Sequence, residues 1–138
     1  MLNASQVKLG NEIMTGEKEL FRVIGGAYGT VENYYLLNDN NMFVKKADTI
    51  EELLDGVEVF AIGEIVNSYK TNLDAEDDAN IGDLFVALTD NGLEARVIVG
   101  SADGSKFFAI DPITGLRKSR TKNSIEELMA SYDEVLVL

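Results

Sequence analysis

Arg22-Val23-Ile24 occurs again as Arg96-Val97-Ile98, and this repeated tripeptide decides the fold because the residues on both sides of it repeat as well. The blocks around it recur in the same order, 72 to 75 residues later. They are Leu9-Gly10-Asn11 with Ile81-Gly82-Asp83, Tyr34-Tyr35-Leu36-Leu37-Asn38 with Phe107-Phe108-Ala109-Ile110-Asp111, and Ile50-Glu51-Glu52-Leu53-Leu54 with Ile125-Glu126-Glu127-Leu128-Met129. Four blocks in one order at nearly constant spacing predict a duplicated unit.

Each copy has the pattern of several short strands. Turn signals that contain Gly separate the first two strands, Thr15-Gly16 in one copy and Asp90-Asn91-Gly92 in the other. Strands are expected at 11–14, 20–24 and 33–37 and again at 84–88, 93–99 and 106–110. A polar strand with Lys45-Lys46 or Arg117-Lys118 follows, and each copy closes on a β-branched run at 57–62 or 135–138.

A short helix is expected before the last strand of each copy. Thr49 and Ser124 precede the sequence Ile-Glu-Glu-Leu, which places an N-cap residue before two acidic residues of a first helical turn. Four or five short strands and a helix of about two turns in roughly 60 to 65 residues are typical of a small bent sheet or barrel. We therefore predict a mainly β protein of two tandem SH3-like units, each ending in a short helix and a strand.

The predicted domain boundaries follow the repeat. Residues 1–66 form the first unit, residues 79–138 the second, and residues 67–78 an acidic linker between them. A unit of this size is marginally stable alone because it buries little apolar surface. The two units are therefore expected to pack against each other.

The composition excludes several classes of function. The chain has no cysteine and no histidine, so disulfide scaffolds and the usual zinc, haem and iron-sulfur ligand sets are excluded. The commonest catalytic bases and nucleophiles are missing as well, and no cofactor, metal or enzymatic activity is expected. No apolar run approaches the ~18 residues of a membrane span, and no signal peptide is evident, so a cytoplasmic location is expected.

The strong negative charge suggests one kind of partner. With 24 acidic and 12 basic residues the net charge is −12, which favours basic protein surfaces and disfavours nucleic acids and anionic membranes. The candidate partner-binding residues are acidic and lie in the linker and the second predicted helix: Asp74, Glu76, Asp77, Asp78, Glu126 and Glu127. An EF-hand calcium loop is not expected in the linker, because Ala79 and Phe85 occupy the positions of its required Gly and Glu.

A basic segment near the end of the chain suggests a different function. Its candidate residues, with one aromatic residue of a neighbouring strand, are Arg117, Lys118, Arg120, Lys122 and Phe108. Cations beside aromatic rings form the surface with which small barrels bind nucleic acids, and the same surface suits a small ligand. The competing interpretation, which the net charge favours, is that these cations protect an exposed edge strand from aggregation.

Two further features have structural interpretations. The run 25–29 is rich in Gly but leads into Tyr34-Tyr35 rather than a helix, so it predicts a hairpin and not a phosphate loop. In each aromatic pair, alternation along a strand predicts one buried and one partly exposed ring. An exposed Tyr35 or Phe108 is a candidate anchor for a partner.

The combined pattern resembles small acidic accessory proteins of bacteriophages and other mobile elements, in which a G-[ND] opening strand, an R-V-I strand, an aromatic strand and an I-E-E-L helix follow one another. The resemblance covers both copies. It implies a non-enzymatic protein that binds and inhibits a host protein, in some cases by presenting carboxylates in place of DNA phosphates. A structural component of an assembly, with association between copies of the chain, is the further alternative.

Overall fold

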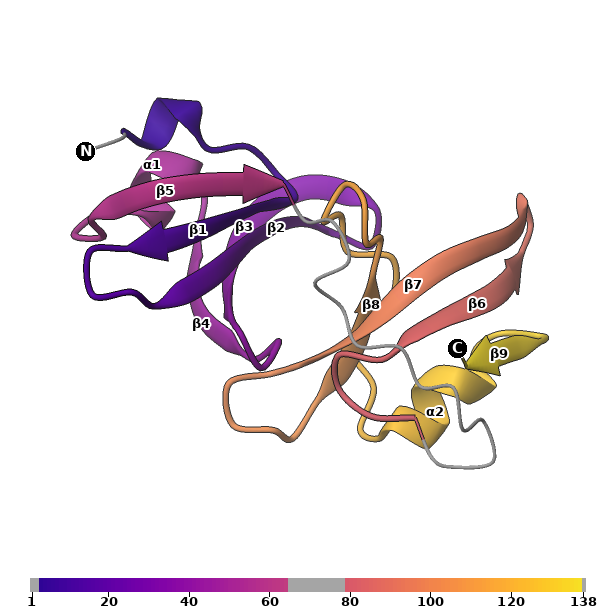
Figure 1. Ribbon diagram of the computed structural model, residues 1–138. Helices are drawn as coiled ribbons and strands as arrows, with labels where there is room; N and C mark the ends of the chain where they lie inside the picture. Colours follow the sequence, from indigo (N-terminus) through magenta and orange to yellow (C-terminus); the bar gives the residue numbers. More distant parts are fainter. Residues whose placement is uncertain (1–2, 65–78, 138) are drawn as a thin grey trace.

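The computed structural model describes residues 3–64 and 79–137 of the 138 residues, and they form a mainly β structure with two antiparallel sheets (Figure 1). The first sheet has the strand order β4-β3-β2-β1-β5. Its strands are β1 (Asn11–Thr15), β2 (Leu20–Ala27), β3 (Thr30–Asn38), β4 (Phe43–Ala47) and β5 (Val59–Glu64). Strands β1 to β4 pair in succession, and β5 returns to pair with β1.

The second sheet has the strand order β8-β7-β6-β9. Its strands are β6 (Leu84–Thr89), β7 (Gly92–Gly100), β8 (Phe107–Ile110) and β9 (Val135–Val137). The polar strand expected after β8 is reduced to two isolated bridges, Ile110 with Arg117 and Phe107 with Lys122. When this segment, residues 117–122, takes the place of β4, the two sheets have the same strand order.

The helices begin where the sequence predicts and are shorter than expected. The side chain of Thr49 accepts a hydrogen bond from Glu52 N before α1 (Ile50–Leu53), and that of Ser124 accepts one from Glu127 N before α2 (Ile125–Ala130). Both N-caps are thereby confirmed. A 3-10 turn, η1 (Ala4–Gln6), has no counterpart in the prediction. Among the described residues, no helix has the length and apolar character that a membrane crossing requires.

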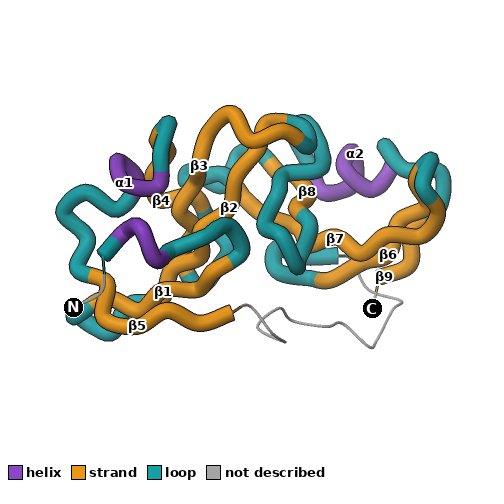
Figure 2. Tube along the Cα trace, turned by 90° about the horizontal axis from the view of Figure 1, so that it is seen from above, coloured by secondary structure: helices purple, strands orange, loops and turns teal. Residues whose placement is uncertain are grey.

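Three hydrophobic clusters form the core, and one of them belongs to both sheets. The first cluster packs within residues 3–64 and the third within residues 79–137. The second, called here the shared core, joins strands β2 and β3 to β7 and β8, which lie side by side in Figure 2. Its buried members are Ile24, Tyr35, Leu37, Val97, Val99, Phe108 and Ile110. Phe43 stands between Tyr35 and Phe108, with ring centroids 4.7 and 4.9 Å away.

Backbone hydrogen bonds join the two sheets at matching places. The Gly25 N–H donates to the carbonyl of Gly115 over 2.9 Å, and the Gly100 N–H donates to the carbonyl of Asn41 over 3.0 Å. Both acceptors have a positive φ, 72° at Gly115 and 58° at Asn41. The turn after the third strand of each half is therefore held by the second strand of the other half.

The register of β7 differs by one residue from the alignment that the repeated tripeptide predicts. The Gly10 N–H donates to Val23 O, whereas that of Gly82 donates to Ile98 O and not to Val97 O. Val23 and Ile98 each face the core of their own half, and Val97 faces the shared core. Because both faces of these central strands are buried, their apolar pattern does not fix the register. A shift of one residue moves each side chain of the strand to the other face of its sheet. Arg22 therefore lies on the face of its sheet that is opposite to the face on which Arg96 lies in the second sheet.

The loop between β7 and β8 is closed by one carboxylate. Oδ1 of Asp103 accepts hydrogen bonds from Ser105 Oγ at 2.7 Å, Ser105 N at 2.9 Å and Ser101 Oγ at 2.8 Å. These bonds, those from Ser105 first, lower the pKa of Asp103 from 3.8 to about 2 because they favour the charged form.

We expect Asp103 to titrate at about pH 2 in the folded protein, as measured by the carboxyl ¹³C chemical shift. A lowered folded-state pKa means that this stabilising contribution is present above pH 3.8 and is lost as the pH falls through about 2. The Asp103→Asn variant should lose this part of the pH dependence of unfolding. A midpoint near 3.8 in the wild-type protein would contradict the hydrogen-bonded loop.

Candidate functional site

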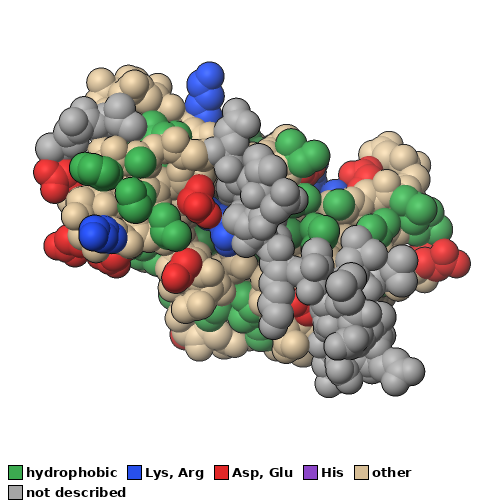
Figure 3. All heavy atoms as spheres, viewed as in Figure 1, with side chains coloured by type: hydrophobic (Ala, Val, Ile, Leu, Met, Phe, Trp, Pro, Cys, Tyr) green, Lys and Arg blue, Asp and Glu red, His purple; other side chains and the backbone are tan. Residues whose placement is uncertain are grey.

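The acidic residues predicted to bind a partner do not form a described site. Asp74, Glu76, Asp77 and Asp78 lie outside the described residues. Glu126 and Glu127 are exposed in the first turn of α2, where Oε2 of Glu127 accepts a hydrogen bond from Asn123 N at 3.1 Å. In Figure 3, carboxylate side chains are spread over both halves of the face in view. The acidic-surface hypothesis therefore stays a prediction.

The prediction that Phe108 contributes to a ligand-binding face is wrong, because its side chain is fully buried. Phe108 and Tyr35 are 0% and 5% exposed, and Phe107 and Tyr34 are their partly exposed neighbours. The alternation within each pair is confirmed, but the ring expected at the surface is the ring in the core. Arg117 belongs to the same packing, since its guanidinium lies 4.9 Å from the centre of the Phe108 ring.

The basic segment 117–122 is held from two sides. On one side, Lys118 N donates to Ala109 O over 2.8 Å and Lys122 N donates to Phe107 O over 2.7 Å, both on β8. On the other side, Arg117 N donates to Gly25 O over 2.7 Å, across the boundary between the two halves. The start of this segment is therefore not a free edge strand of the kind that charged residues protect.

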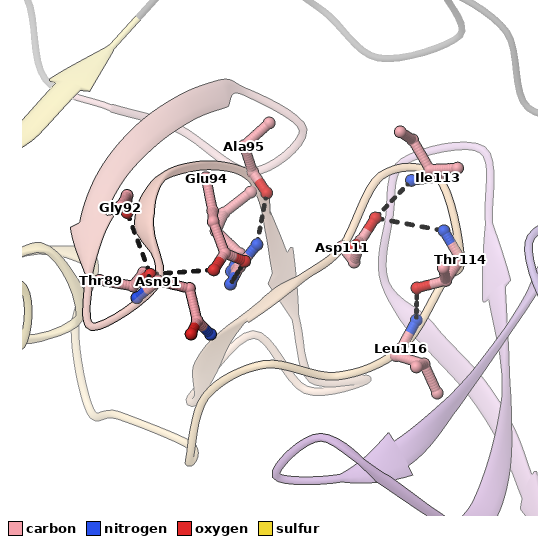
Figure 4. Close-up of polar contacts among 10 residues, drawn as sticks. Thr89, Asn91, Gly92, Glu94, Ala95, Asp111, Ile113, Thr114 and Leu116 are labelled. Carbon is pink, nitrogen blue, oxygen red and sulfur yellow. Dashed lines mark hydrogen bonds and ion pairs between the residues drawn. The ribbon is translucent and has the colours of Figure 1, made fainter.

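A tight turn positions the segment from its N-terminal side. Oδ1 of Asp111 accepts hydrogen bonds from Ile113 N at 2.7 Å and Thr114 N at 3.2 Å, and Thr114 Oγ1 accepts one from Leu116 N at 3.2 Å (Figure 4). The turn ends at Gly115, whose carbonyl accepts the bond from Gly25 N. The direction of residues 117–122 is thus fixed relative to both sheets.

A small pocket lies where this segment meets the β2–β3 turn and the end of α2. Its volume is about 110 Å³. We call it the basic pocket and define it by its lining residues: Tyr28, Lys118, Ser119, Arg120, Lys122, Ser131 and Tyr132. The residues come from three separate parts of the chain, and Tyr28 and Tyr132 are 104 positions apart. Tyr28 is the lining residue that the first half contributes, and the other six come from the second half.

Among the described residues, the cations of the basic pocket form no ion pair with a carboxylate. Ion pairs among the described residues join Arg22 to Glu12 (3.4 Å) and Arg96 to Glu94 (2.7 Å), and neither pair belongs to the pocket. Within the described part of the chain, the side-chain nitrogens of Lys118 and Lys122 also make no hydrogen bond. A concave surface with unpaired positive charge is suited to an anion.

The first half uses its corresponding strand differently. Nζ of Lys45 on β4 donates to the carbonyl of Glu52 at the end of α1 over 3.0 Å. The same carbonyl also accepts a hydrogen bond from Asp55 N at 3.3 Å, so Lys45 adds a second bond at the C-terminal end of the helix. The lysines of the basic pocket make no such bond to α2, so the structural role of Lys45 does not account for them.

Tyr28 occupies a backbone conformation that is unfavourable for its residue type. Tyr28 and Gly29 form the two-residue turn between β2 and β3, with φ of 57° and 93°. Such turns favour Asn, Asp and Gly, and a left-handed conformation costs other residues about 1 to 2 kcal/mol. Tyr28 is 63% exposed. Its cation-π contact with Arg120, whose guanidinium lies 5.1 Å from the ring centre, stabilises the folded state by about 0.5 to 1 kcal/mol. The contact with Arg120 does not offset the backbone cost.

Tyr132 presents a phenol whose hydroxyl is enclosed. Its ring packs edge-on against Phe85, with centroids 5.6 Å apart, and the hydroxyl is buried beside Arg96. Burial raises the pKa of Tyr132 because it disfavours the phenolate, and the charge of Arg96 opposes this increase. Because the hydroxyl is shielded from solvent, it is not exposed to a ligand in the basic pocket.

Arg96 lies behind Tyr132 and is already engaged. Its Nη2 donates to Oε2 of Glu94 at 2.7 Å and its Nη1 to Ala95 O at 2.8 Å, while Thr89 Oγ1 donates to Oε1 of Glu94 at 2.9 Å (Figure 4). The hydrogen bonds from Arg96 and then Thr89 lower the pKa of Glu94. Arg96 is thus held by this network, and the pocket cations are Lys118, Arg120 and Lys122.

Sequence reasoning identified three of the pocket residues and missed four. Lys118, Arg120 and Lys122 were expected to act together, and the structure places all three on one pocket. The residues that it missed are Tyr28, Ser119, Ser131 and Tyr132. The sequence gives one signal for Tyr28, namely a bulky aromatic residue within the Gly-rich turn 25–29. Ser119 has a structural role, since its Oγ accepts the bond from Ala109 N at 2.7 Å.

Comparison with protein-family models, curated proteins and solved structures gives no match to this chain.

Proposed function

We propose that this chain is a non-enzymatic binding protein that holds a small phosphate-bearing molecule in the basic pocket. The observation that supports this most directly is the convergence of Lys118, Arg120 and Lys122 on one pocket, where no Asp or Glu is among the lining residues and no ion pair of the described residues involves these cations. Three cations are a quarter of the 12 basic residues in a chain whose net charge is −12. Such a concentration of positive charge suits a dianionic group.

The chemistry of the lining residues fits phosphate in particular. Two ammonium groups and a guanidinium supply charge-assisted hydrogen bonds, which are about twice as strong as neutral ones. A neutral ligand would leave these donors unpaired, which costs free energy on binding.

We further infer that each half is a small SH3-like barrel and that the two halves arose by duplication. The support is the meander of four strands with a fifth that returns to the first, which is the order of the first sheet and, with residues 117–122 included, of the second. In both halves the short helix precedes the returning strand. On this view, the basic pocket belongs to the contact between two barrels.

The binding proposal predicts a specific loss of affinity. The double variant Lys118→Gln, Lys122→Gln should bind inorganic phosphate or a phosphate monoester at least about 10-fold more weakly, because it loses two charge-assisted contacts of the ligand. Isothermal titration calorimetry at low ionic strength measures this change. Because both side chains are partly exposed, wild-type affinity should also fall as salt is added.

The matched control is the double variant Lys8→Gln, Lys46→Gln. It changes the net charge by the same amount at two exposed positions outside the pocket. Its affinity should stay within about twofold of the wild-type value, since screening weakens interactions over more than about 10 Å. Equal losses in the two double variants would show a general charge effect and contradict a site at the basic pocket.

A further inference from the structure

We propose that the ligand of the basic pocket is a nucleoside monophosphate, with its phosphate at Lys118 and Lys122 and its base stacked on the ring of Tyr28. This inference rests on the proposed function and specifies its ligand. It is carried by the position and exposure of Tyr28, by the size of the pocket and by the charge of the chain.

The ring of Tyr28 is placed to stack with a planar group. Arg120 lies over the ring at 5.1 Å from its centre, and the side chain is 63% exposed, so the ring keeps an accessible face. The residue has a φ of 57°, a conformation that a bulky side chain rarely adopts. A strained, exposed aromatic residue at the rim of a pocket is a reason to assign the ring a contact with a ligand.

The size of the pocket indicates that only part of the ligand lies inside it. Pockets that enclose a whole drug-sized molecule have volumes of about 300 to 1,000 Å³. The basic pocket has about 110 Å³, which is enough for a phosphate group and too small to enclose a whole nucleotide. The part of the ligand that is attached to the phosphate must therefore lie outside the pocket. There it can contact Tyr28, the exposed aromatic residue at the rim. A nucleobase stacks well on such a ring because every base has a π face.

The charge of the chain selects a single nucleotide over a nucleic acid strand. The three cations of the pocket are enough to neutralise one dianionic phosphate, while the net charge of −12 repels the following phosphates of a polyanion. Nucleic acid binders usually carry a basic stripe along the strand path. The cations assigned to this ligand are confined to residues 118–122.

The experiment compares AMP, ribose 5-phosphate and adenosine as ligands of the full chain at low ionic strength. We expect AMP to bind about 10-fold more tightly than ribose 5-phosphate, because stacking of one base on an aromatic side chain has an effect of this order. Adenosine should bind more weakly than either. In the NMR spectrum of AMP, the H2 and H8 protons should shift upfield on binding, which reports the ring current of a stacked tyrosine.

Two variants of Tyr28 make the test specific. Tyr28→Asn keeps a residue that tolerates the left-handed turn and removes the ring, and Tyr28→Phe keeps the ring. The asparagine variant should melt at or above the wild-type temperature, because Asn suits the left-handed turn. It should keep its affinity for ribose 5-phosphate but bind AMP no more tightly than that sugar phosphate. The phenylalanine variant should retain the wild-type preference.

The outcomes separate this inference from the proposed function. Equal affinities of the wild-type protein for AMP and ribose 5-phosphate would overturn the stacking on Tyr28 and leave phosphate binding standing. Tighter binding of an eight-residue oligothymidylate than of AMP would overturn the choice of a mononucleotide. If neither phosphate compound nor inorganic phosphate binds, the proposed function fails as well.

Discussion

Replacement of Phe108 by alanine is expected to lower the free energy of unfolding by about 3 to 5 kcal/mol, the usual cost of removing a buried phenyl ring. Phe108 is fully buried in the shared core, where its ring contacts Phe43 at 4.9 Å between centroids and lies under the guanidinium of Arg117. The cavity left behind borders strands of both sheets. We therefore expect Phe108→Ala to destabilise the protein as a single unit.

Urea unfolding followed by far-UV circular dichroism and by tyrosine fluorescence measures this effect. The matched control is Phe60→Ala, since Phe60 is 66% exposed on β5. A surface change of this kind usually alters stability by no more than about 0.5 kcal/mol. A loss below about 1 kcal/mol for Phe108→Ala would contradict a packed shared core.

Replacement of Gly115 by alanine is expected to cost about 2 to 4 kcal/mol, because strain and a steric clash act together there. Gly115 has a φ of 72°, and a Cβ at this position would lie 2.9 Å from Gly10 N, 3.1 Å from Val23 O and 3.2 Å from Gly10 Cα. All three atoms belong to the backbone of the other half, so no side-chain rotation relieves the clash. The variant would force the two halves apart at this point.

Gly56→Ala separates the two causes. Gly56 has a φ of 78°, close to that of Gly115, and a Cβ added there has no atom within 4 Å. Its expected cost is therefore the backbone strain alone, about 1 to 2 kcal/mol. Thermal and urea unfolding of the two variants under identical conditions measure the difference. If the two costs are equal, the steric clash expected between a Cβ at position 115 and the backbone of Gly10 and Val23 is absent.

The local elements were predictable because their signals are local. Gly and Asn turn residues, the N-caps Thr49 and Ser124 and alternating apolar residues act over a few positions, and the strands and helices form close to where these signals place them. The register of β7 was not predictable from the repeated tripeptide. A strand buried on both faces has no polar face that marks its alignment, so the match of Arg22 with Arg96 was misleading.

The candidate site was predictable only in part, for a related reason. The cations 118, 120 and 122 alternate along one segment, so a common face follows from the strand period. Tyr28 and Tyr132 join them through the packing of the two halves, and no local pattern encodes that contact. Phe108 was placed at the surface because alternation identifies two faces but does not say which face is covered. Here the second half covers the first, and both faces of β8 are occupied.

The most direct test of the account is an NMR titration of the ¹⁵N-labelled full chain with inorganic phosphate, which maps where an anion binds. We expect saturable shifts of the amides of Tyr28, of residues 118–122 and of Ser131 and Tyr132, with the amides of Lys8 and Lys46 unchanged. Shifts that do not saturate, or that are as large around Lys8 and Lys46 as in the basic pocket, would contradict it.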